Sequence, residues 1–442
     1  MVVRQFVNSI YQSGVRNLTL CAKFNPSLTS VGRVFSTELQ KNSLSLNGLQ
    51  YEQDDFTNVT PKILYHIGHN LHNSESHPLC FLKKRIVDYF YSTFKGRTGN
   101  PVFSFYDDIY PAVSVYQNFD SLLISQDHPS RRKTDCYYIN KNYLLRAHMT
   151  AHQSEMLKSG LDNFLLFGDV YRRDEIDTTH YPVFHQADAV RLCSNAQLET
   201  LANGHVEIFE GKGGKETEEK QAVYTIDATK IMENELKTTL VGLAQSLFGK
   251  DIPCRWVDVF FPFTHPSWEL EVQFEGKWLE VLGCGIMRHE ILETNGAEGR
   301  IGWAFGLGLE RLAMCLYKIP DIRMFWSKDT GFTSQFSGKS HTEEITFKQV
   351  SIYPQCTKDI SFWIPENFEP NDFHELVREA GGELIEQVYL FDEFTHPKTG
   401  KRSKCYRIIY RHISRTLTNK EVNKLHTKIS EKSTNLLGVT VR

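Results

Sequence analysis

The sequence predicts an α+β protein with two domains, a large one built on a mainly antiparallel sheet and a small C-terminal one. Short runs rich in aromatic and β-branched residues over 254–262, 268–274 and 278–282 are typical of antiparallel strands. The order strand, helix, strand, strand, helix, strand over 349–442 is that of a ferredoxin-like domain. The length of 442 residues is enough for both domains to bury a core.

The larger domain is expected over 45–325. Apolar residues at three- and four-residue intervals, and short buried runs, predict further elements within it. These are helices over 79–94, 144–157 and 228–248 and strands over 163–171 and 183–191. A polar, glycine-rich stretch over 204–221 is interpreted as a surface loop.

The smaller domain has recognisable helix ends. Gly381 and Gly382 are expected to end its first helix, because glycine readily adopts the backbone conformations found there. Thr418 and Glu421 have the spacing of a capping box at the start of its second helix. The preceding stretch, 326–348, is polar and loosely patterned, so it is predicted to be the linker between the domains.

Composition excludes several classes of protein. No run of 18 apolar residues is present, so no membrane-spanning helix is expected and a membrane partner is excluded. The nine cysteines are scattered without a Cys-x-x-Cys pair, which argues against a structural zinc site and favours a reducing compartment. The net charge of −3 hides two basic ends, since residues 398–442 contain twelve Lys and Arg but only two Glu.

The N-terminal end is predicted to be a mitochondrial transit peptide over 1–35. It contains four basic residues, apolar residues at helical spacing, and no acid before Glu38. The segment Arg33 to Ser36 is similar to a matrix-peptidase site with cleavage after Phe35, so the expected location is the mitochondrial matrix. The alternative is a tail whose basic residues occur by chance.

The most informative stretch reads GWAFGLGLER over 302–311 and runs into an apolar helix. Small residues let a ligand lie against the backbone. Arg311 then supplies a fixed fork of donors suited to phosphate. A glycine-rich turn alone is a weak signal, and it becomes strong here because a second arginine segment lies upstream.

That upstream segment reads GDVYRRDEIDTTHYPVFHQ over 168–186 and predicts a hairpin of two strands. A hairpin of this kind can aim an arginine and an aromatic ring into one site. Arg172 would hold an α-phosphate oxygen and Phe184 would stack on a purine. The alternative is a surface hairpin with ion-paired arginines.

A third segment reads FPFTHPS over 261–267. Phe261 and Phe263 flank a proline, and a rigid aromatic pair suits a pocket for another aromatic ring. The alternative is core packing at the end of a strand.

Together these motifs resemble the class II aminoacyl-tRNA synthetases, and most of all the single-chain, mitochondrial phenylalanyl-tRNA synthetases. VYRRDEID is similar to motif 2 of that class and GLGLERLAM to motif 3. HYPVFHQ, FPFTHPS and WLEVLGCGIM resemble segments particular to the phenylalanine enzymes. The C-terminal module resembles their anticodon-binding domain, so the likeness covers nearly everything after residue 60.

The resemblance implies ATP-dependent attachment of phenylalanine to tRNA(Phe) through a phenylalanyl-adenylate, with Mg²⁺, in a monomer. Arg172 and Arg311 correspond to the catalytic arginines on the two sides of the nucleotide. The residues implied for ATP binding are Arg172, Thr179, His180, Tyr181, Phe184, Glu280 and Arg311. No dedicated protein site for a metal is implied, but Glu280 is placed to bind magnesium or a ribose hydroxyl.

The resemblance also implies an amino-acid pocket. Its residues are His148, Thr150, Gln153, Gln186, Asp188, Phe261, Phe263, Ala304 and Phe305. Two of them depart from the family pattern, which often has Ser at position 150 and usually Glu at position 188. Asp188 keeps the charge that pairs with the substrate ammonium but reaches about one methylene less far, so direct contact and contact through a water are both open.

The basic C-terminal end suits RNA. Its candidate tRNA-binding residues are Arg402, Lys404, Arg407, Arg411 and Arg415. Phosphate contacts there predict salt-dependent affinity, and Tyr406, Tyr410 and His412 are expected to stack on anticodon bases. The alternative is a solvated basic face.

Two other functions stay open at this point. One is an enzyme on the same scaffold that uses a different amino acid, which the Phe261 and Phe263 pair disfavours. The other is a synthetase-like RNA-binding protein without catalysis, which the joint presence of Arg172, Gln186, Glu280 and Arg311 disfavours.

Overall fold

The structure, a computed structural model, describes residues 43–327, 330–348, 353–412 and 415–442. The predicted transit peptide over 1–35 lies outside the described residues. Residues 43–442 group into one unit. The expected α+β class is confirmed, with a mainly antiparallel sheet followed by a ferredoxin-like domain.

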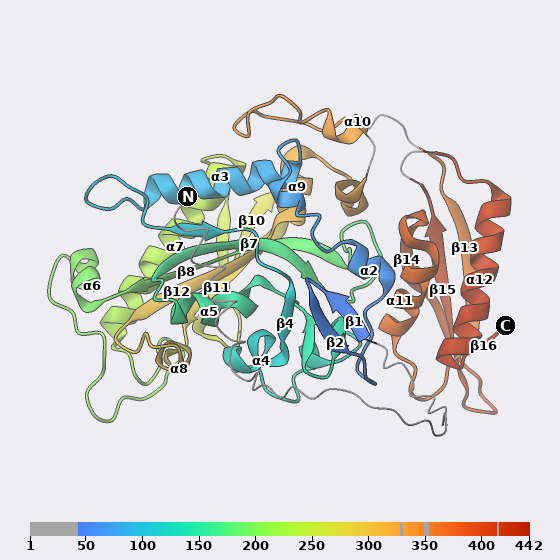
Figure 1. The fold of residues 1–442 in the computed structure, drawn as a ribbon, viewed down its shortest axis with the longest axis horizontal. Helices are drawn as coiled ribbons and strands as arrows, with labels where there is room; N and C mark the ends of the chain where they lie inside the picture. The colour runs from blue at the N-terminus through green and yellow to red at the C-terminus, as the bar shows by residue number, and fades with distance from the viewer. Residues whose placement is uncertain (1–42, 328–329, 349–352, 413–414) are drawn as a thin grey trace, which may run out of the picture. The chain divides into compact units, whose positions relative to one another are not determined.

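A seven-stranded sheet forms the centre of the larger domain (Figure 1). Its order is β3-β7-β8-β12-β11-β10-β9, and every neighbouring pair is antiparallel except β3 and β7. The strands are β3 (Ser104–Tyr106), β7 (Asn163–Tyr171), β8 (Val183–Cys193), β12 (Ile301–Gly308), β11 (Lys277–Met287), β10 (Thr264–Phe274) and β9 (Cys254–Asp258).

Three helices cover one face of this sheet, namely α3 (Pro78–Thr93), α7 (Ile226–Phe248) and α9 (Leu309–Tyr317). Successive strand residues point to opposite faces. Leu165 of β7 therefore lies in the core beneath the helices, whereas Leu166 lies in a second apolar cluster on the other face. That second face contains the cavities described below.

The two long helices follow the sequence prediction closely. Helix α3 begins with Pro78, whose missing N–H costs nothing at the first helical position. Helix α7 begins after Thr225, whose side chain accepts a hydrogen bond from the Ala228 N–H, and it ends at Gly249. Helix α7 buries one apolar stripe, as its spacing predicts, whereas the first six residues of α3 are all buried.

The helix predicted over 144–157 is only partly present, because its first five residues are not helical. The chain instead forms β6 (Tyr143–Leu145), a 3₁₀ turn over Met149–His152 and the short helix α5 (Gln153–Lys158). The Arg146 N–H donates to the Pro111 carbonyl at 2.9 Å, and its carbonyl accepts from the Tyr171 N–H at 2.9 Å. These bonds to other segments replace the ladder that a helix would need.

Shorter elements complete the larger domain. They are β1 (Ser43–Leu46), β2 (Leu49–Glu52), α2 (Pro61–Tyr65), β4 (Ala112–Ser114), α4 (Val115–Asn118), β5 (Tyr138–Asn140), α6 (Asn195–Ala202), α8 (His289–Thr294) and α10 (Thr330–Thr333). The stretch expected as a linker over 326–348 packs Phe332, Phe336, Ile345 and Phe347 into the core of the larger domain. These four apolar side chains are spread among polar residues, so the sequence shows no periodic pattern there.

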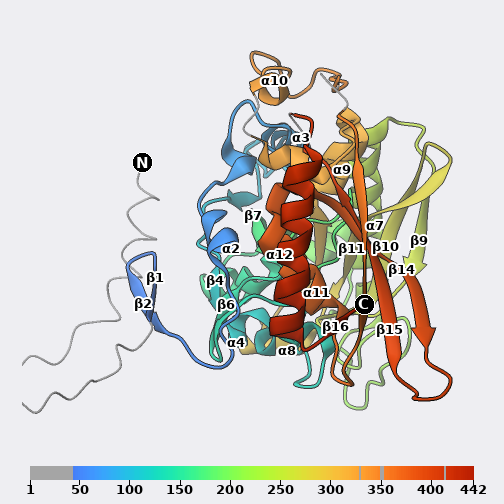
Figure 2. The ribbon, with the colours of Figure 1, turned by 90° about the vertical axis from the view of Figure 1, so that its right-hand side faces the viewer.

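The C-terminal domain has the predicted element order. It consists of β13 (Cys356–Trp363), α11 (Pro370–Gly381), β14 (Ile385–Thr395), β15 (Arg402–Tyr410), α12 (Asn419–Leu437) and β16 (Thr440–Val441). The sheet order is β14-β15-β13-β16, all antiparallel, and α11 and α12 lie side by side (Figure 2). Thr418 and Glu421 form the expected capping box at the start of α12. None of the helices in the described part of the chain is long and apolar enough to cross a membrane.

Candidate active site

Two cavities adjoin on the open face of the central sheet. Strands β8, β10, β11 and β12 and the 3₁₀ turn line the first, and the hairpin loop between β7 and β8 together with the start of α9 lines the second. Four residues line both cavities, namely Arg172, Gln186, Glu280 and Gly306. The two predicted arginine segments therefore meet at a single bipartite site.

The glycines of β12 make room for this site. Gly306 pairs with Asp188 across β8 and β12, and a Cβ atom at position 306 would lie 3.0 Å from the Asp188 Oδ1 atom. A Cβ atom at Gly283 of β11 would lie 2.8 Å from the Phe261 ring. Both glycines thus let side chains of the site lie directly on the sheet.

The inner end of the first cavity is apolar. The Phe261 and Phe263 rings are stacked at 5.7 Å between centroids and 9° between planes. Ala304 lies in the apolar cluster on the same face, and Phe263 packs against that cluster. Phe305 also borders the cavity, but its ring stacks on Phe90 at 5.7 Å in the core beneath the helices. The ring pair and Ala304 therefore line one apolar part of the cavity.

The other end of this cavity is polar and buried. Asp188 Oδ2 accepts a hydrogen bond of 2.6 Å from the Thr150 hydroxyl, and burial raises the pKa of the Asp188 carboxyl to about 7. Burial lowers the pKa of His148 to about 3, so this ring is neutral. Gln186 Oε1 accepts from the Met149 N–H at 3.3 Å. Gln153 is buried, with its amide 3.7 Å from the Met287 sulfur.

The second cavity is lined by charged and aromatic groups. Arg172 Nε donates to the Ala147 carbonyl at 2.7 Å, and its guanidinium lies over the Phe184 ring at 5.2 Å. Arg311 lies across the cavity, 3.4 Å from Glu280 Oε2. These bonds orient Arg172 while leaving most of its N–H donors available to a phosphate.

The loop between β7 and β8 supplies a histidine to the second cavity. His180 Nδ1 lies 2.7 Å from Asp177 Oδ2, and this hydrogen bond, the largest influence on the ring, raises the pKa of His180. Burial raises the pKa of Asp177, but its bonds from His180 and from the Thr179 N–H outweigh burial and hold that pKa below its usual range. His180, Thr179 and Tyr181 all line the second cavity.

Sequence reasoning missed Asp177. Its carboxylate also accepts from the backbone N–H groups of Thr179 at 2.6 Å and His180 at 2.8 Å. Aspartate commonly bonds the backbone two residues ahead in turns. An Asp followed by Thr-Thr-His was therefore the available signal.

A buried pair joins the two arginine segments, and the sequence analysis assigned it no role. Glu310, the neighbour of Arg311, accepts from the His185 backbone N–H at 2.8 Å and lies 2.6 Å from His185 Nδ1. His185 stands between Phe184 and Gln186 on β8. The pair therefore fixes the start of α9 against the strand that carries two other site residues.

The acids at the site suit a divalent cation only together with other oxygen ligands. In the described ranges, no group of three or more His, Cys, Asp or Glu side chains is arranged to hold a metal ion on its own. Glu269 and Glu280 nevertheless both line the first cavity, and partial burial followed by the charge of Glu280 raises the pKa of Glu269. Two carboxylates beside a phosphate site fit Mg²⁺, which usually binds one or two carboxylates plus substrate oxygens.

Four of the five candidate tRNA-binding residues are paired with acids. Arg407 bonds Asp359 through two contacts of 2.7 Å. The other pairs are Arg411 with Glu386, Arg415 with Glu421 and Lys404 with Glu393, at 2.8, 2.9 and 3.8 Å. Arg402 is exposed. Each of these side chains still leaves donors for a phosphate.

The expectation that Tyr406 and Tyr410 stack on bases is wrong. Both rings are buried, at 2% and 0% exposure, in the core formed with α11 and α12. The exposed aromatic residues of this domain are on β14 instead and include Tyr389, Phe391 and Phe394. The Arg407 guanidinium lies 3.6 Å from the centre of the Phe391 ring.

Comparison with known proteins agrees with both domains. The family model described as tRNA synthetases class II core domain (F) matches residues 65–225 and 220–336, and the model described as ferredoxin-fold anticodon binding domain matches residues 351–442. The chain is 54% identical over 420 residues to the probable phenylalanine–tRNA ligase, mitochondrial, of Drosophila melanogaster, covering 90% of this chain and 92% of that one.

Two further relatives carry the same description. The mitochondrial phenylalanine–tRNA ligase of Mus musculus is 50% identical over 402 residues, covering 90% of this chain and 89% of its own. That of Saccharomyces cerevisiae is 37% identical over 469 residues, covering 94% and 98%. The likeness thus spans both domains and almost the full length of each relative.

Proposed function

Because the chain belongs to the mitochondrial phenylalanine–tRNA ligase family of class II aminoacyl-tRNA synthetases, we propose that its two adjoining cavities are the two halves of one active site. Membership makes the chain an ATP-dependent enzyme that attaches phenylalanine to tRNA in mitochondria. The first cavity binds phenylalanine and the second binds ATP. The observation that carries this assignment is the wall shared by the two cavities, which includes Arg172.

The shared wall is where the reacting atoms meet. A carboxylate oxygen of phenylalanine attacks the α-phosphorus of ATP, the bond to the bridging oxygen breaks, and pyrophosphate leaves with the electron pair. A carboxylate is already ionised at neutral pH, so this step needs positioning and positive charge rather than a general base. Arg172 supplies that charge at the α-phosphate, and Arg311 and His180 supply it at the other phosphates.

Glu269 and Glu280 would hold Mg²⁺ together with phosphate oxygens. When bound, the ion supplies positive charge to the pyrophosphate leaving group. The Phe184 ring stacks on adenine, with Thr179 and Tyr181 beside it. Arg311 lies across the same cavity, so in this assignment its contact with Glu280 gives way to contact with the nucleotide.

The first cavity selects phenylalanine through its two ends. Phe261, Phe263 and Ala304 surround the phenyl ring. Asp188 and Gln186 receive the ammonium group. Thr150, His148 and Gln153 complete the polar end. Asp188 is buried without a cation within bonding distance among the described residues, which supports its role as partner for the ammonium.

The second step transfers the acyl group to RNA. The 2′-hydroxyl oxygen of the terminal ribose attacks the acyl carbon and its proton is released, while AMP leaves with the electron pair of the broken anhydride bond. The C-terminal domain binds the anticodon end through Arg402, Lys404, Arg407, Arg411 and Arg415 and through the exposed aromatics of β14. The enzyme acts as a monomer in the mitochondrial matrix, after removal of residues 1–35.

Pyrophosphate exchange into ATP tests the assignment. Wild type exchanges with phenylalanine and with no other natural amino acid at a comparable rate. Arg172→Ala loses at least about a hundredfold in exchange while keeping the circular dichroism spectrum of wild type, as expected for removal of one preorganised charge. Exchange near the wild-type rate in this variant would refute the shared-wall assignment.

A further inference from the structure

The loop between β7 and β8 lines the second cavity with some of its side chains and packs against the C-terminal domain with another. Asp174, Thr179 and His180 line the second cavity. Ile176, between them in sequence, is 7% exposed and lies in the core cluster of the C-terminal domain, together with residues such as Val388 and Phe373. A residue of the predicted ATP loop is therefore buried by the other domain.

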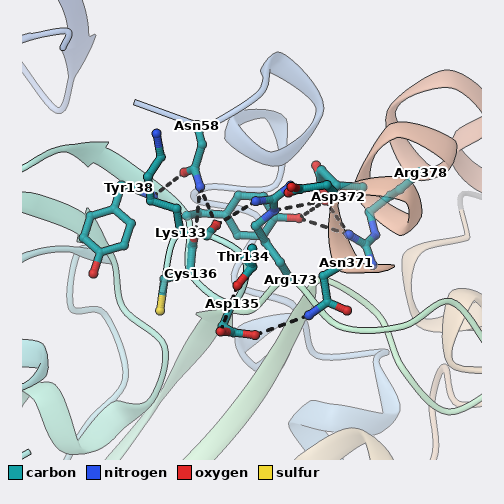
Figure 3. A network of polar contacts seen from close by, with 12 residues as sticks. Asn58, Lys133, Thr134, Asp135, Cys136, Tyr138, Arg173, Asn371, Asp372 and Arg378 are labelled. Atoms are coloured by element: carbon teal, nitrogen blue, oxygen red, sulfur yellow. Dashed lines mark hydrogen bonds and ion pairs between the residues drawn. The ribbon is translucent and has the colours of Figure 1, made fainter. Parts of the chain in front are cut away.

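Backbone hydrogen bonds strengthen this attachment. The Val388 N–H of β14 donates to the Ile176 carbonyl at 2.8 Å. The Arg378 guanidinium of α11 donates to the Asp174 carbonyl and is itself ion-paired with Glu375. Figure 3 shows the neighbouring part of this contact, where Arg173 reaches Asp372 at 3.3 Å.

A second segment of the ATP cavity is attached in the same way. Ile322 lines the cavity, and its N–H donates to the Thr178 carbonyl at 2.9 Å. The adjacent Arg323 donates to the Ile385 carbonyl at 2.6 Å, at the first residue of β14. The start of β14 thus holds both segments.

The loop forms no regular element of its own, and outside the C-terminal domain Arg173 bonds the Asp135 and Lys133 carbonyls. Residues 172–182 form no helix or strand ladder after β7 ends at Tyr171. Asp177 directly follows Ile176, and its hydrogen bonds organise the turn that carries His180. An irregular segment that loses its buried side chain and its backbone partners samples more conformations, and the affinity of a ligand falls with the population of the competent one.

We propose that Ile176 is a positioning residue for ATP: the C-terminal domain, by burying Ile176 and bonding the loop at Asp174 and Ile176, keeps His180 where ATP binds. The inference rests on the proposed assignment of the second cavity to ATP. The affinity for ATP then depends on the docking of the C-terminal domain, whereas the affinity for phenylalanine does not depend on it. Linkage requires the reverse as well, so ATP strengthens the docking.

Steady-state pyrophosphate exchange in the full chain tests the forward effect. Ile176→Ala raises the KM for ATP by about fivefold or more, the range of a typical coupling between sites. It changes the KM for phenylalanine by less than about twofold, and Ile176→Val recovers most of the ATP affinity. A parallel rise in both KM values would mean a general structural effect and would overturn the proposal.

Val422→Ala is the matched control. Val422 lies in the same C-terminal core but on α12, and none of the hydrogen bonds or ion pairs among the described residues joins it to the loop. This variant loses a similar apolar contact and keeps the wild-type KM for ATP. An equal rise in Val422→Ala would show that any weakening of the domain suffices, which contradicts a specific role for Ile176.

His180→Gln separates this inference from the function on which it depends. If His180→Gln leaves the KM for ATP unchanged, the ATP assignment itself fails. If it raises that KM and Ile176→Ala does not, only the present inference fails. When each substitution raises the KM for ATP, we expect the double variant to show a less than additive effect, because both substitutions act through one contact.

Hydrogen exchange in wild type tests the reverse effect without any variant. ATP with Mg²⁺ slows exchange of the Val388 amide, which donates to the Ile176 carbonyl, and phenylalanine alone does not. Equal protection of Val388 with and without ATP would overturn the proposal.

Discussion

The Thr150 hydroxyl donates a 2.6 Å hydrogen bond to Asp188 Oδ2 inside the first cavity. In the sequence these residues are 38 positions apart, on the 3₁₀ turn and on β8. The bond fixes the carboxylate of Asp188, whose side chain is one methylene shorter than that of Glu, among the polar groups of the cavity. The other carboxylate oxygen, Oδ1, takes no part in this bond.

The pKa of Asp188 predicts how phenylalanine binding depends on pH. Burial raises this pKa to about 7, opposed by the Thr150 bond and by the charge of Arg172. The carboxyl is therefore neutral below about pH 7 and cannot pair with the ammonium there. We expect kcat/KM for phenylalanine to increase as pH rises through about 7 and then to level off, measured by exchange at saturating ATP.

Asp188→Asn tests whether that pH dependence belongs to Asp188. The variant loses the titration between pH 6 and 8 and raises the KM for phenylalanine about tenfold or more, as expected for loss of a hydrogen bond to a charged group. A variant that keeps the wild-type pH profile would assign the titration to another residue.

His180 predicts a pH effect of the opposite sign on ATP. Its pKa is raised first by Asp177, with Asp174 adding to the rise and burial and Arg311 opposing it. The ring therefore keeps its charge above the ordinary histidine range and loses it as pH rises through the raised pKa. We expect the KM for ATP to increase over that interval and Asp177→Asn to move the increase to lower pH. An unmoved profile in Asp177→Asn would exclude this pair as its origin.

Ala304 predicts the selectivity of the pocket. It lies on the cavity side of β12, in the apolar cluster against which Phe263 packs. Ala304→Gly opens space at the para position of the bound ring, and we expect activation of para-chlorophenylalanine relative to phenylalanine to improve about tenfold, the usual value of one small apolar group. Exchange assays with both amino acids measure this ratio, and an unchanged ratio would remove Ala304 from the pocket wall.

Arg402 predicts the salt dependence of tRNA charging. Arg402→Ala raises the KM for tRNA and reduces the slope of log affinity against log salt by about 1, because one phosphate contact is lost. Arg415→Ala, whose arginine is already paired with Glu421 at 2.9 Å, has a smaller effect and serves as control. Amino-acid activation stays unchanged in both. A fall in activation together with charging would place Arg402 outside RNA binding.

Local patterns predicted much of the fold. Helix α7 and the ends of the C-terminal helices depend on apolar spacing, on Thr caps and on glycine, which act within a few residues. The helix predicted over 144–157 is missing over 144–148 because Arg146 bonds to Pro111 and Tyr171, which are distant in sequence. Tyr406 and Tyr410 were expected to be accessible because a basic, aromatic stretch does not reveal which face of a strand is covered.

By itself, the sequence determined which chemical groups the candidate site contains: two arginine segments, a phenylalanine pair and glycines such as Gly283 and Gly306. Only the tertiary structure decided that Glu310 bonds His185, that Asp177 holds His180 and that Ile176 is buried by the C-terminal domain. Residue types and short-range spacing set the first group. The second depends on contacts between distant segments, whose geometry is decided by packing of the whole sheet and of the two domains.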